Sequence, residues 1–381
     1  MESGAPEQTA RKTDVLIVGG GLSGLSLARE LARLGTDFLL IEARERLGGR
    51  ILSTTVSPGP ETASFDLGPA WFWPGQPEIA TLLKELGIEA FEQYARGDAL
   101  AEDETGRRFR GRGLESMAGA FRPAGGFGSI VERIARDIPS KQLLMARKVV
   151  RVRRLESCLR TLSLDGSGAG VDIESRSVIF AIPPRLVAGG LDFEPALDRD
   201  VLDALRNIPT WMAGHAKLLA IYERPFWREA GLSGDAMSRL GPLMEIHDAS
   251  PPTGGPYALF GFFGVSATDR AGKQEELLLQ TRAQLARLFG AEGAHPLHLA
   301  FQDWATEPFT SSELDREPLL AHPRYGLPRS LEQVWGGRLQ FASTETAQFS
   351  GGLLEGALEA AERVAATLGS AQKVEKSLSV R

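Results

Sequence analysis

The sequence predicts an α/β protein with a doubly wound parallel sheet and a second, mixed α+β domain. An apolar, β-branched run at 14–18 is followed by helical spacing over 22–34 and by another apolar run at 38–41. Strand, helix and strand within about 30 residues form a βαβ unit, which requires parallel strands. Two apolar runs much later in the chain, 217–222 and 257–263, predict strands of a second sheet. The length of 381 residues accommodates about two or three domains.

The remaining elements follow from the same periodicities. Gly35 is the expected C-cap of the first helix, since glycine tolerates the left-handed conformation found there. Residues 1–13 are expected to be a disordered lead-in and 372–381 a polar tail. Further helices are expected at 79–86, 129–138, 274–289 and 353–368, and further strands at 149–153, 161–164, 171–174, 178–182 and 339–342.

Composition excludes several classes of protein. The net charge of −6 argues against a nucleic-acid scaffold. The one cysteine, Cys158, permits no intramolecular disulfide and fits a reducing compartment. The histidines form no HExxH pattern, so no metal site is expected. No apolar run approaches the roughly 18 residues of a membrane span, and residues 1–13 lack the apolar core of a secretory signal, so the cytoplasm is the expected location.

A glycine motif lies between the first strand and the first helix. Gly19, Gly21 and Gly24 form GxGxxG, in which the glycines permit a tight turn, close backbone approach to a pyrophosphate, and helix–strand packing. The helix N-terminus then offers free N–H groups to the phosphates. Glu42 ends the second strand, where a carboxylate that accepts a ribose hydroxyl is expected. These features together predict a bound dinucleotide in a Rossmann-like domain.

The segment after Glu42 reads EARERLGGR up to Arg50. The glycine pair could pass beneath a cofactor while Arg50 reaches a phosphate or the ribityl chain. It could equally be an ordinary Gly-Gly turn with a solvated arginine. The residues alone leave both interpretations open.

Several motifs together resemble the flavin-containing amine oxidases, a family that includes monoamine and polyamine oxidases. EAxxRxGGR after GxGxxG resembles the start of their FAD-binding domain. The segment FASTETAQFSGGLLEGALEAA at 341–361 is similar to their closing motif, and VIFAIPP at 178–184 and GGFGSIVERI at 125–134 agree in order. The similarity runs through most of residues 14–368.

The resemblance implies a division of the chain into interleaved domains. The FAD-binding domain would comprise 14–78, 125–207 and 308–369, and the substrate domain 79–124 and 208–307, with flexible tails at 1–13 and 370–381.

The same resemblance implies the residues that bind FAD. Glu345 would bond the ribityl hydroxyls, the N–H of Leu354 would face flavin N1 and the C2 carbonyl, and the main chain of Val149 would meet the adenine. FAD should be non-covalent, because no cysteine follows Trp304, which matches a tryptophan that flanks the flavin. The full expected set is Gly19, Gly21, Leu22, Ser23, Gly24, Glu42, Ala43, Arg44, Gly49, Arg50, Gly68, Pro69, Ala70, Trp71, Val149, Trp304, Glu345, Leu353 and Leu354.

Lys217 is the expected catalytic residue. It lies in the apolar segment GHAKLLAIYERPFW, which resembles a family segment whose lysine holds a water against flavin N5. Burial there would lower the pKa of the lysine, and its charge would assist electron transfer to O2. From the residues alone, an edge-strand lysine that extends to solvent is the favoured interpretation.

Departures from the family bear on the substrate. Trp71, Leu314 and Leu353 are expected to line the substrate site. Leucine replaces the paired tyrosines that form an aromatic cage in the mammalian enzymes. A bulkier, more apolar amine than benzylamine is therefore expected, unless Phe309, Tyr325 or Phe349 supplies a ring.

The predicted function is an FAD-dependent amine oxidase of small-molecule amines. A hydride would pass from a C–H beside nitrogen to flavin N5, and O2 would reoxidise the flavin to give H2O2. One alternative is an FAD-dependent desaturase or oxidase of carbon–carbon bonds, similar to protoporphyrinogen oxidase or phytoene desaturase. The other is a non-catalytic flavoprotein subunit, since fold does not fix function. The sequence does not indicate an oligomeric state.

Overall fold

The computed structural model describes residues 10–57, 62–112, 117–317, 319 and 321–379, with side chains up to residue 370. The chain forms two compact units. The first comprises Met1–Gly49, Val131–Trp211 and His322–Arg381, and the second comprises Arg50–Ile130 and Met212–Ala321. Residues 50–78, 125–130 and 308–321, which the sequence predicts in the FAD-binding domain, group with the second unit, and residues 208–211, predicted in the substrate domain, group with the first. The functional domain assignment itself stays a prediction.

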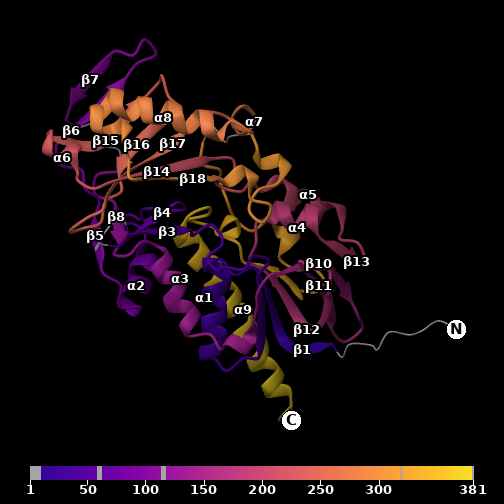
Figure 1. Ribbon diagram of the computed structural model, residues 1–381. Helices are drawn as coiled ribbons and strands as arrows, with labels where there is room; N and C mark the ends of the chain where they lie inside the picture. The colour runs from indigo at the N-terminus through magenta and orange to yellow at the C-terminus, as the bar shows by residue number, and fades with distance from the viewer. Residues whose placement is uncertain (1–9, 58–61, 113–116, 318, 320, 380–381) are drawn as a thin grey trace. The chain divides into compact units, whose positions relative to one another are not determined.

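The first unit is built on an eight-stranded sheet (Figure 1). Its centre is parallel, as the βαβ pattern predicts, because β1 pairs in parallel with β2 on one side and with β12 on the other. The strands β10 and β11 extend the sheet in antiparallel fashion. The strand bounds are β1 (Arg11–Val18), β2 (Phe38–Ile41), β9 (Leu143–Leu144), β10 (Arg147–Arg154), β11 (Leu159–Asp165), β12 (Gly170–Phe180), β13 (Asp192–Glu194) and β19 (Leu339–Phe341).

Three expectations about this unit are wrong. The lead-in does not extend to residue 13, because β1 begins at Arg11, where pairing with β12 orders the backbone. The two strands expected at 171–174 and 178–182 are the single strand β12, whose pairing with β1 spans both. The helix expected to end at 368 is α9 (Leu354–Ser379), which continues through most of the expected tail.

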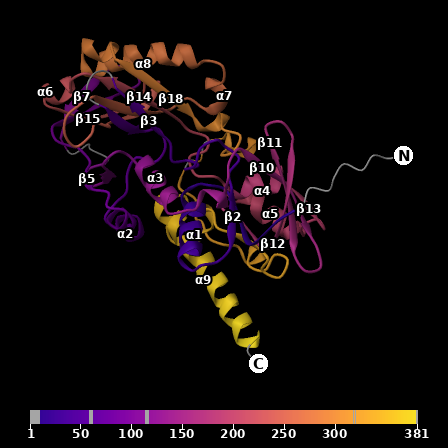
Figure 2. The ribbon, with the colours of Figure 1, turned by 60° about the horizontal axis from the view of Figure 1, so that its bottom comes forward.

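Helices α1 (Leu22–Arg33) and α9 lie side by side in both views (Figures 1 and 2). α1 ends as predicted, with Gly35 in the left-handed region at a φ of 67°. The core on the sheet is aliphatic and aromatic, with Leu16, Phe180 and Phe341 at its centre. The other helices of this unit are α4 (Pro184–Gly190) and α5 (Arg199–Asn207).

The second unit contains a seven-stranded sheet in the order β18-β14-β17-β16-β15-β6-β7. α8 (Gln274–Phe289), predicted at its observed bounds, lies along this sheet in Figures 1 and 2 and buries Leu277, Leu285 and Phe289. The strands are β6 (Asp98–Glu102), β7 (Arg108–Gly111), β14 (Ala216–Tyr222), β15 (Leu232–Ser238), β16 (Leu243–Asp248), β17 (Tyr257–Phe263) and β18 (His298–Asp303).

Short elements complete the second unit. The ribbon of β3 (Ser53–Val56) and β4 (Ala63–Asp66) leads into the predicted Gly68–Trp71 segment, and β5 (Ala90–Glu92) pairs with β8 (Phe121–Pro123). The remaining helices are α2 (Pro77–Glu85), α6 (Phe226–Glu229) and α7 (Ala267–Arg270); α3 (Gly128–Arg136) spans the boundary between the units. Within the described ranges, no helix is both long enough and apolar enough to cross a membrane.

The third glycine of the motif yields a test of the packing of α1 on β1. A Cβ at Gly24 would lie 2.0 Å from the carbonyl oxygen of Gly19, whereas one at Gly189 in α4 would meet nothing within 4 Å. Gly24→Ala should lower the free energy of unfolding by about 2 kcal/mol or more through overpacking. Gly189→Ala is the control and should raise it by about 0.5–1 kcal/mol, because alanine is the better helix former. Denaturant unfolding measures both, and equal effects would contradict the close approach.

Candidate functional site

The glycine turn of the first unit is held by backbone contacts that exclude side chains. Gly19 has a φ of 109°, and a Cβ there would lie 2.8 Å from the carbonyl oxygen of Ala181. Gly21 is the N-cap of α1 and provides no side-chain acceptor for the first N–H groups of the helix. Those N–H groups and the positive end of the helix dipole suit an anionic ligand.

Glu42 lies beside this turn and is 4% exposed. One carboxylate oxygen accepts the N–H of Gly20 at 2.7 Å and the other accepts the N–H of Arg44 at 2.8 Å. Each oxygen has a further lone pair that can accept a hydroxyl. The carboxylate is thus fixed at the end of β2 and remains chemically able to bind a ribose.

The glycine pair after Glu42 packs against the glycine turn. The N–H of Gly48 donates to the carbonyl of Gly20 at 2.8 Å, and Gly21 and Gly48 form a parallel bridge. A Cβ at Gly49, whose φ is 60°, would lie 3.1 Å from the Cα of Gly21. Gly48 and Gly49 therefore form, with Gly19, Gly21 and Gly24, a glycine cradle of closely packed main chain. Its contact with a cofactor stays a prediction.

The C-terminal motif reaches the same region of the first unit. The hydroxyl of Ser23 donates to the carbonyl of Ala342 at the end of β19. Glu345 is completely buried two residues beyond Ser343, whose hydroxyl is buried without a hydrogen-bond partner. A buried polar group in this state calls for an additional partner. The cradle, Glu42 and this hydroxyl together fit a dinucleotide.

An aromatic cluster that the sequence analysis largely missed lies at the start of α9. A Cβ at Gly351 would lie 2.2 Å from the side chain of Tyr325, and one at Gly352 would lie 2.9 Å from that of Trp211. The His322 ring joins the two, with centroids 4.5 Å from Trp211 and 5.5 Å from Tyr325. Only Tyr325 was a candidate, because Trp211 is far from the motif along the chain and carries no spacing signal.

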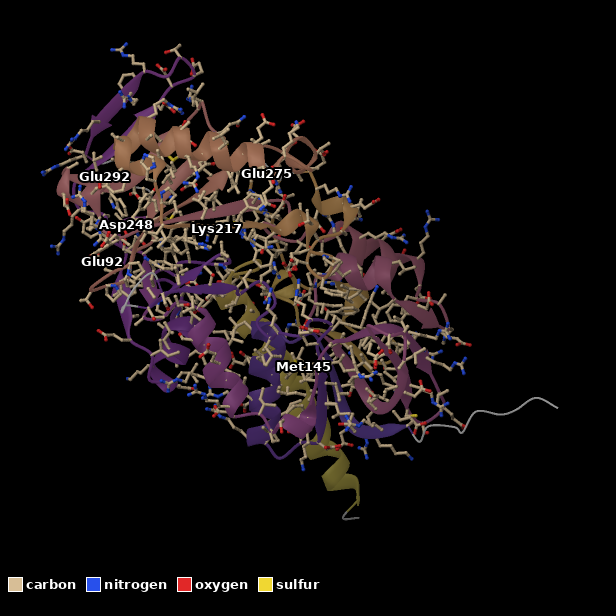
Figure 3. All side chains as sticks on the ribbon, viewed as in Figure 1. Glu92, Met145, Lys217, Asp248, Glu275 and Glu292 are labelled. Carbon is tan, nitrogen blue, oxygen red and sulfur yellow. The ribbon has the colours of Figure 1, made fainter. Side chains whose placement is uncertain are left out.

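In the second unit, Lys217 lies on β14, which is paired on both sides, and is 2% exposed (Figure 3). Its ammonium donates to the carbonyl of Gly68 at 2.6 Å and, more weakly, to that of Asp66 at 3.4 Å. The Nζ lies 4.4 Å from the ring centroid of Phe260 and 5.8 Å from that of Trp71. A lysine that extends to solvent is excluded.

This environment lowers the pKa of Lys217 from 10.5 to about 7. Burial is the main cause, because it disfavours the charged form. The negative charge of Asp66 opposes the shift, while the guanidinium of the buried Arg122, which the sequence analysis missed, adds to it. Lys217 therefore changes its charge near neutral pH.

The segment that carries these carbonyls is itself fixed. The indole of Trp304 donates to the carbonyl of Leu67 at 3.1 Å, and that of Trp71 donates to Gln93 at 2.9 Å. The carboxyl of Asp66 accepts from Ser53 and from the N–H of Phe127, and burial raises its pKa despite these bonds. Lys217 and Trp304 thus both bond the main chain of the segment that carries Trp71; that these residues form one site stays a prediction.

The predicted residues fall in both units. The first unit holds Gly19, Gly21, Leu22, Ser23, Gly24, Glu42, Ala43, Arg44, Gly49, Val149, Glu345, Leu353 and Leu354, and the second holds Arg50, Gly68, Pro69, Ala70, Trp71, Lys217, Trp304 and Leu314. Leu314 is 57% exposed, and its pairing with Leu353 stays a prediction. Cys158 is half-buried in the turn between β10 and β11. No group of His, Cys, Asp or Glu in the described part of the chain could hold a metal ion.

Comparison with known proteins gives a consistent result. A profile of the family described as flavin containing amine oxidoreductase matches residues 22–116 and 110–368. The putative flavin-containing monoamine oxidase AofH of Mycobacterium tuberculosis is 26% identical, over 94% of this chain and 96% of that protein. Putrescine oxidase of Kocuria rosea is 24% identical, over 80% of this chain and 84% of that protein.

Solved structures show the same fold. A putrescine oxidase with bound putrescine superposes with a TM-score of 0.77 and 22% identity, covering 95% of this chain and 100% of that one. Cyclohexylamine oxidase from Brevibacterium oxydans gives a TM-score of 0.75 and 20% identity, covering 95% and 99%.

The buried lysine leads to a stability prediction whose sign depends on pH. Between pH 7 and 10.5 the folded state binds fewer protons than the unfolded state, so stability rises with pH across this window. Lys217→Met removes the penalty and should raise the free energy of unfolding at pH 6 by on the order of 5 kcal/mol, a gain that shrinks toward pH 10.

Denaturant unfolding across pH 6–10 measures this gap, which is the difference in the free energy of unfolding between the wild type and Lys217→Met. Lys84→Met, at an exposed position on α2, is the matched control. A gap that does not depend on pH would contradict the buried titration of Lys217.

Proposed function

The chain belongs to the flavin-containing amine oxidoreductase family, and on that premise we propose that it is an FAD-dependent amine oxidase. The observation that carries the proposal is the burial of the Lys217 ammonium against an aromatic wall formed by Trp71 and Phe260. Lys217 lies in the second unit, whereas the glycine cradle lies in the first. When bound, FAD would accept a hydride at N5 from the C–H beside the substrate nitrogen, and its reoxidation by O2 would give H2O2.

The first unit supplies the groups that would hold FAD. The N–H groups at the start of α1 would bind the pyrophosphate, Glu42 a ribose hydroxyl, and Glu345 the ribityl chain. Val149, buried on β10, would meet the adenine through its main chain. Binding would be non-covalent, since Cys158, in the β10–β11 turn, is the only cysteine.

Lys217 would act on the proton and charge balance of the reaction. Its pKa of about 7 keeps both the ammonium and the amine populated near neutral pH. As the ammonium, it would stabilise the negative charge that develops on O2 during reduction; through its N–H groups it would hold a water in place. This role favours an oxidase over a carbon–carbon desaturase, which has no such need for a buried cation.

The substrate is proposed to be a bulky, apolar amine. Leu314 and Leu353 offer apolar surface where the mammalian enzymes place tyrosines, so binding would depend on buried area at about 25 cal/mol per Å². Tyr325 and Trp211 pack beside Gly351 and Gly352, in the turn that precedes Leu353.

Anaerobic mixing with an amine panel tests this function. Secondary and cyclic amines should bleach the flavin absorbance, and admission of O2 should restore it with release of H2O2. Benzylamine should react more slowly than the larger amines. Absence of bleaching by every amine would contradict the function, and benzylamine as the best substrate would contradict the proposed substrate class alone.

A second prediction isolates Lys217. Lys217→Met should retain FAD but slow reoxidation of the reduced enzyme by O2 at least about tenfold, equivalent to about 1.4 kcal/mol in the barrier. Stopped-flow mixing with oxygenated buffer measures the rate, with Lys84→Met as the control for loss of a lysine. An unchanged rate in Lys217→Met would restrict this residue to a structural role.

A further inference from the structure

A second buried cation site lies near Lys217 and has no part in the function proposed above. We propose that His247 is a positioning residue: as an imidazolium held between Asp235 and Glu245, it fixes Trp71 and Phe260 against Lys217 and limits the negative charge near that lysine. The kinetic consequence rests on the proposed function, whereas the charge state and the coupling do not.

The hydrogen bonds of His247 define its charge. The residue lies on β16 and is 1% exposed. Its Nδ1 is 2.8 Å from a carboxylate oxygen of Asp235 on β15, and its Nε2 is 2.8 Å from one of Glu245 on its own strand. A neutral imidazole carries a single N–H, and ionised carboxylates only accept. Both bonds form together when the ring carries two protons.

The balance of burial and charge agrees with this geometry. Burial alone would lower the pKa of His247, but its hydrogen bonds to Asp235 and Glu245 and their negative charges raise it above the ordinary value. Loss of the proton would leave the buried carboxylate of Asp235 and the partly exposed one of Glu245 beside a neutral ring, which is unfavourable. The geometry and the surrounding charges therefore both favour the doubly protonated ring.

The imidazolium and the ammonium share the same aromatic rings. The His247 centroid is 5.2 Å from that of Trp71 and 5.4 Å from that of Phe260. Both rings also face the Lys217 ammonium, at 5.8 and 4.4 Å. Phe260 is directly opposite His247 in the β16–β17 register, and only β17 separates β16 from the strand of Lys217.

Trp71 is fixed from two sides as a result. Its indole N–H donates to Gln93, whose own amide donates to the carbonyl of Asp248 beside His247. The His247 ring meets Trp71 at an interplanar angle of 82°. A change at His247 thus acts on the aromatic wall of Lys217 without any direct contact with the lysine being required.

The other charged groups near His247 have hydrogen-bond partners of their own. The carboxylate of Asp248 accepts two bonds from Arg228 and one from the indole of Trp227. Arg122 donates to the carbonyls of Ala249 and Ser250, just beyond β16, and is among the charges that act on Lys217 together with Asp66. The carboxylates that His247 contacts directly are those of Asp235 and Glu245.

The coupling predicts shifts of opposite sign in two variants. His247→Gln removes a positive charge and should raise the pKa of Lys217, whereas Glu245→Gln removes a negative charge and should lower it. If His247 acted only through packing, both variants would loosen the contacts of Trp71 and Phe260 with Lys217. The pKa of Lys217 would then shift in the same direction in both variants, or would not shift in either.

The first experiment reads the charge of His247 directly. Nitrogen-15 NMR of the histidine-labelled full chain, with its bound cofactor, should show one histidine with two ring N–H signals that persist at pH values above the ordinary pKa of histidine. These signals should disappear in His247→Gln and remain in His298→Gln, an exposed control on β18. A single ring N–H on His247 at pH 8 would overturn the imidazolium.

The second experiment reads the coupling without enzymatic activity. The pH midpoint of the stability difference between Lys217 and Lys217→Met chains is measured in the wild-type, His247→Gln, Glu245→Gln and His298→Gln backgrounds. Midpoints displaced upward by at least about half a pH unit in His247→Gln and downward in Glu245→Gln support the inference, with His298→Gln unchanged. Displacement in one direction, or none, would overturn it.

The inference can still be contradicted if a variant does not fold or if the enzyme is inactive. If His247→Gln does not fold, Asp235→Asn and Glu245→Gln should each lower the midpoint, and a rise in either overturns the coupling. If amines fail to reduce the flavin while the midpoints move as predicted, the proposed function is wrong and the charge coupling stands. In an active enzyme, the pH midpoint of reoxidation should move in the same sense as the stability midpoint.

Discussion

The burial of one ammonium group organises the second unit. Lys217 lies on β14, a strand paired on both sides, and its charge meets the carbonyls of Asp66 and Gly68, the faces of aromatic rings and the carboxyl of Asp66. Such a cation is costly to bury, so its surroundings must be held tightly enough to keep water and alternative conformations out. Trp304, Asp66 and Gln93 each fix part of the 66–71 segment, and the His247 cluster fixes the rings. The free-energy cost of burying the Lys217 ammonium therefore depends on how precisely residues 66–71 are placed.

The glycines of the first unit allow segments of main chain to pack closely against one another. Backbone must approach backbone at Gly19, Gly24 and Gly49, and side chains are excluded by contacts of 2–3 Å. The result is a cradle whose polar groups are mostly N–H groups, with Glu42 as its fixed carboxylate. An arrangement of this kind binds phosphates through the backbone and a ribose through one side chain. It leaves the chemistry to groups elsewhere in the chain.

Local patterns predicted the parts of the structure that depend on short-range order. The βαβ unit, α1 with Gly35 at its end, β14, β17 and α8 appear where periodicity and capping place them, and the burial of Lys217 agrees with its apolar strand. Periodicity failed where pairing decides the outcome. β12 reads as two strands because its middle is polar, yet it pairs with β1 along its length. Trp211, Arg122 and His247 were missed because their partners are distant in sequence, so that no spacing marks them. His247 in particular reads as an isolated histidine until the β15–β16 register brings Asp235 beside it.

The interleaving of the two units has a consequence for biosynthesis. The chain passes between them four times, and the first unit needs its last segment, His322–Arg381, to provide β19 and α9. The second unit is complete once Ala321 has left the ribosome, although the chain begins in the other unit. Until the final 60 or so residues follow, the apolar edge of β12 and one face of α1 have no partner, since domains assemble in the order in which their segments emerge. A nascent or truncated chain would therefore expose the unfinished sheet of the first unit to chaperones and proteases after the sheet that carries Lys217 had already formed.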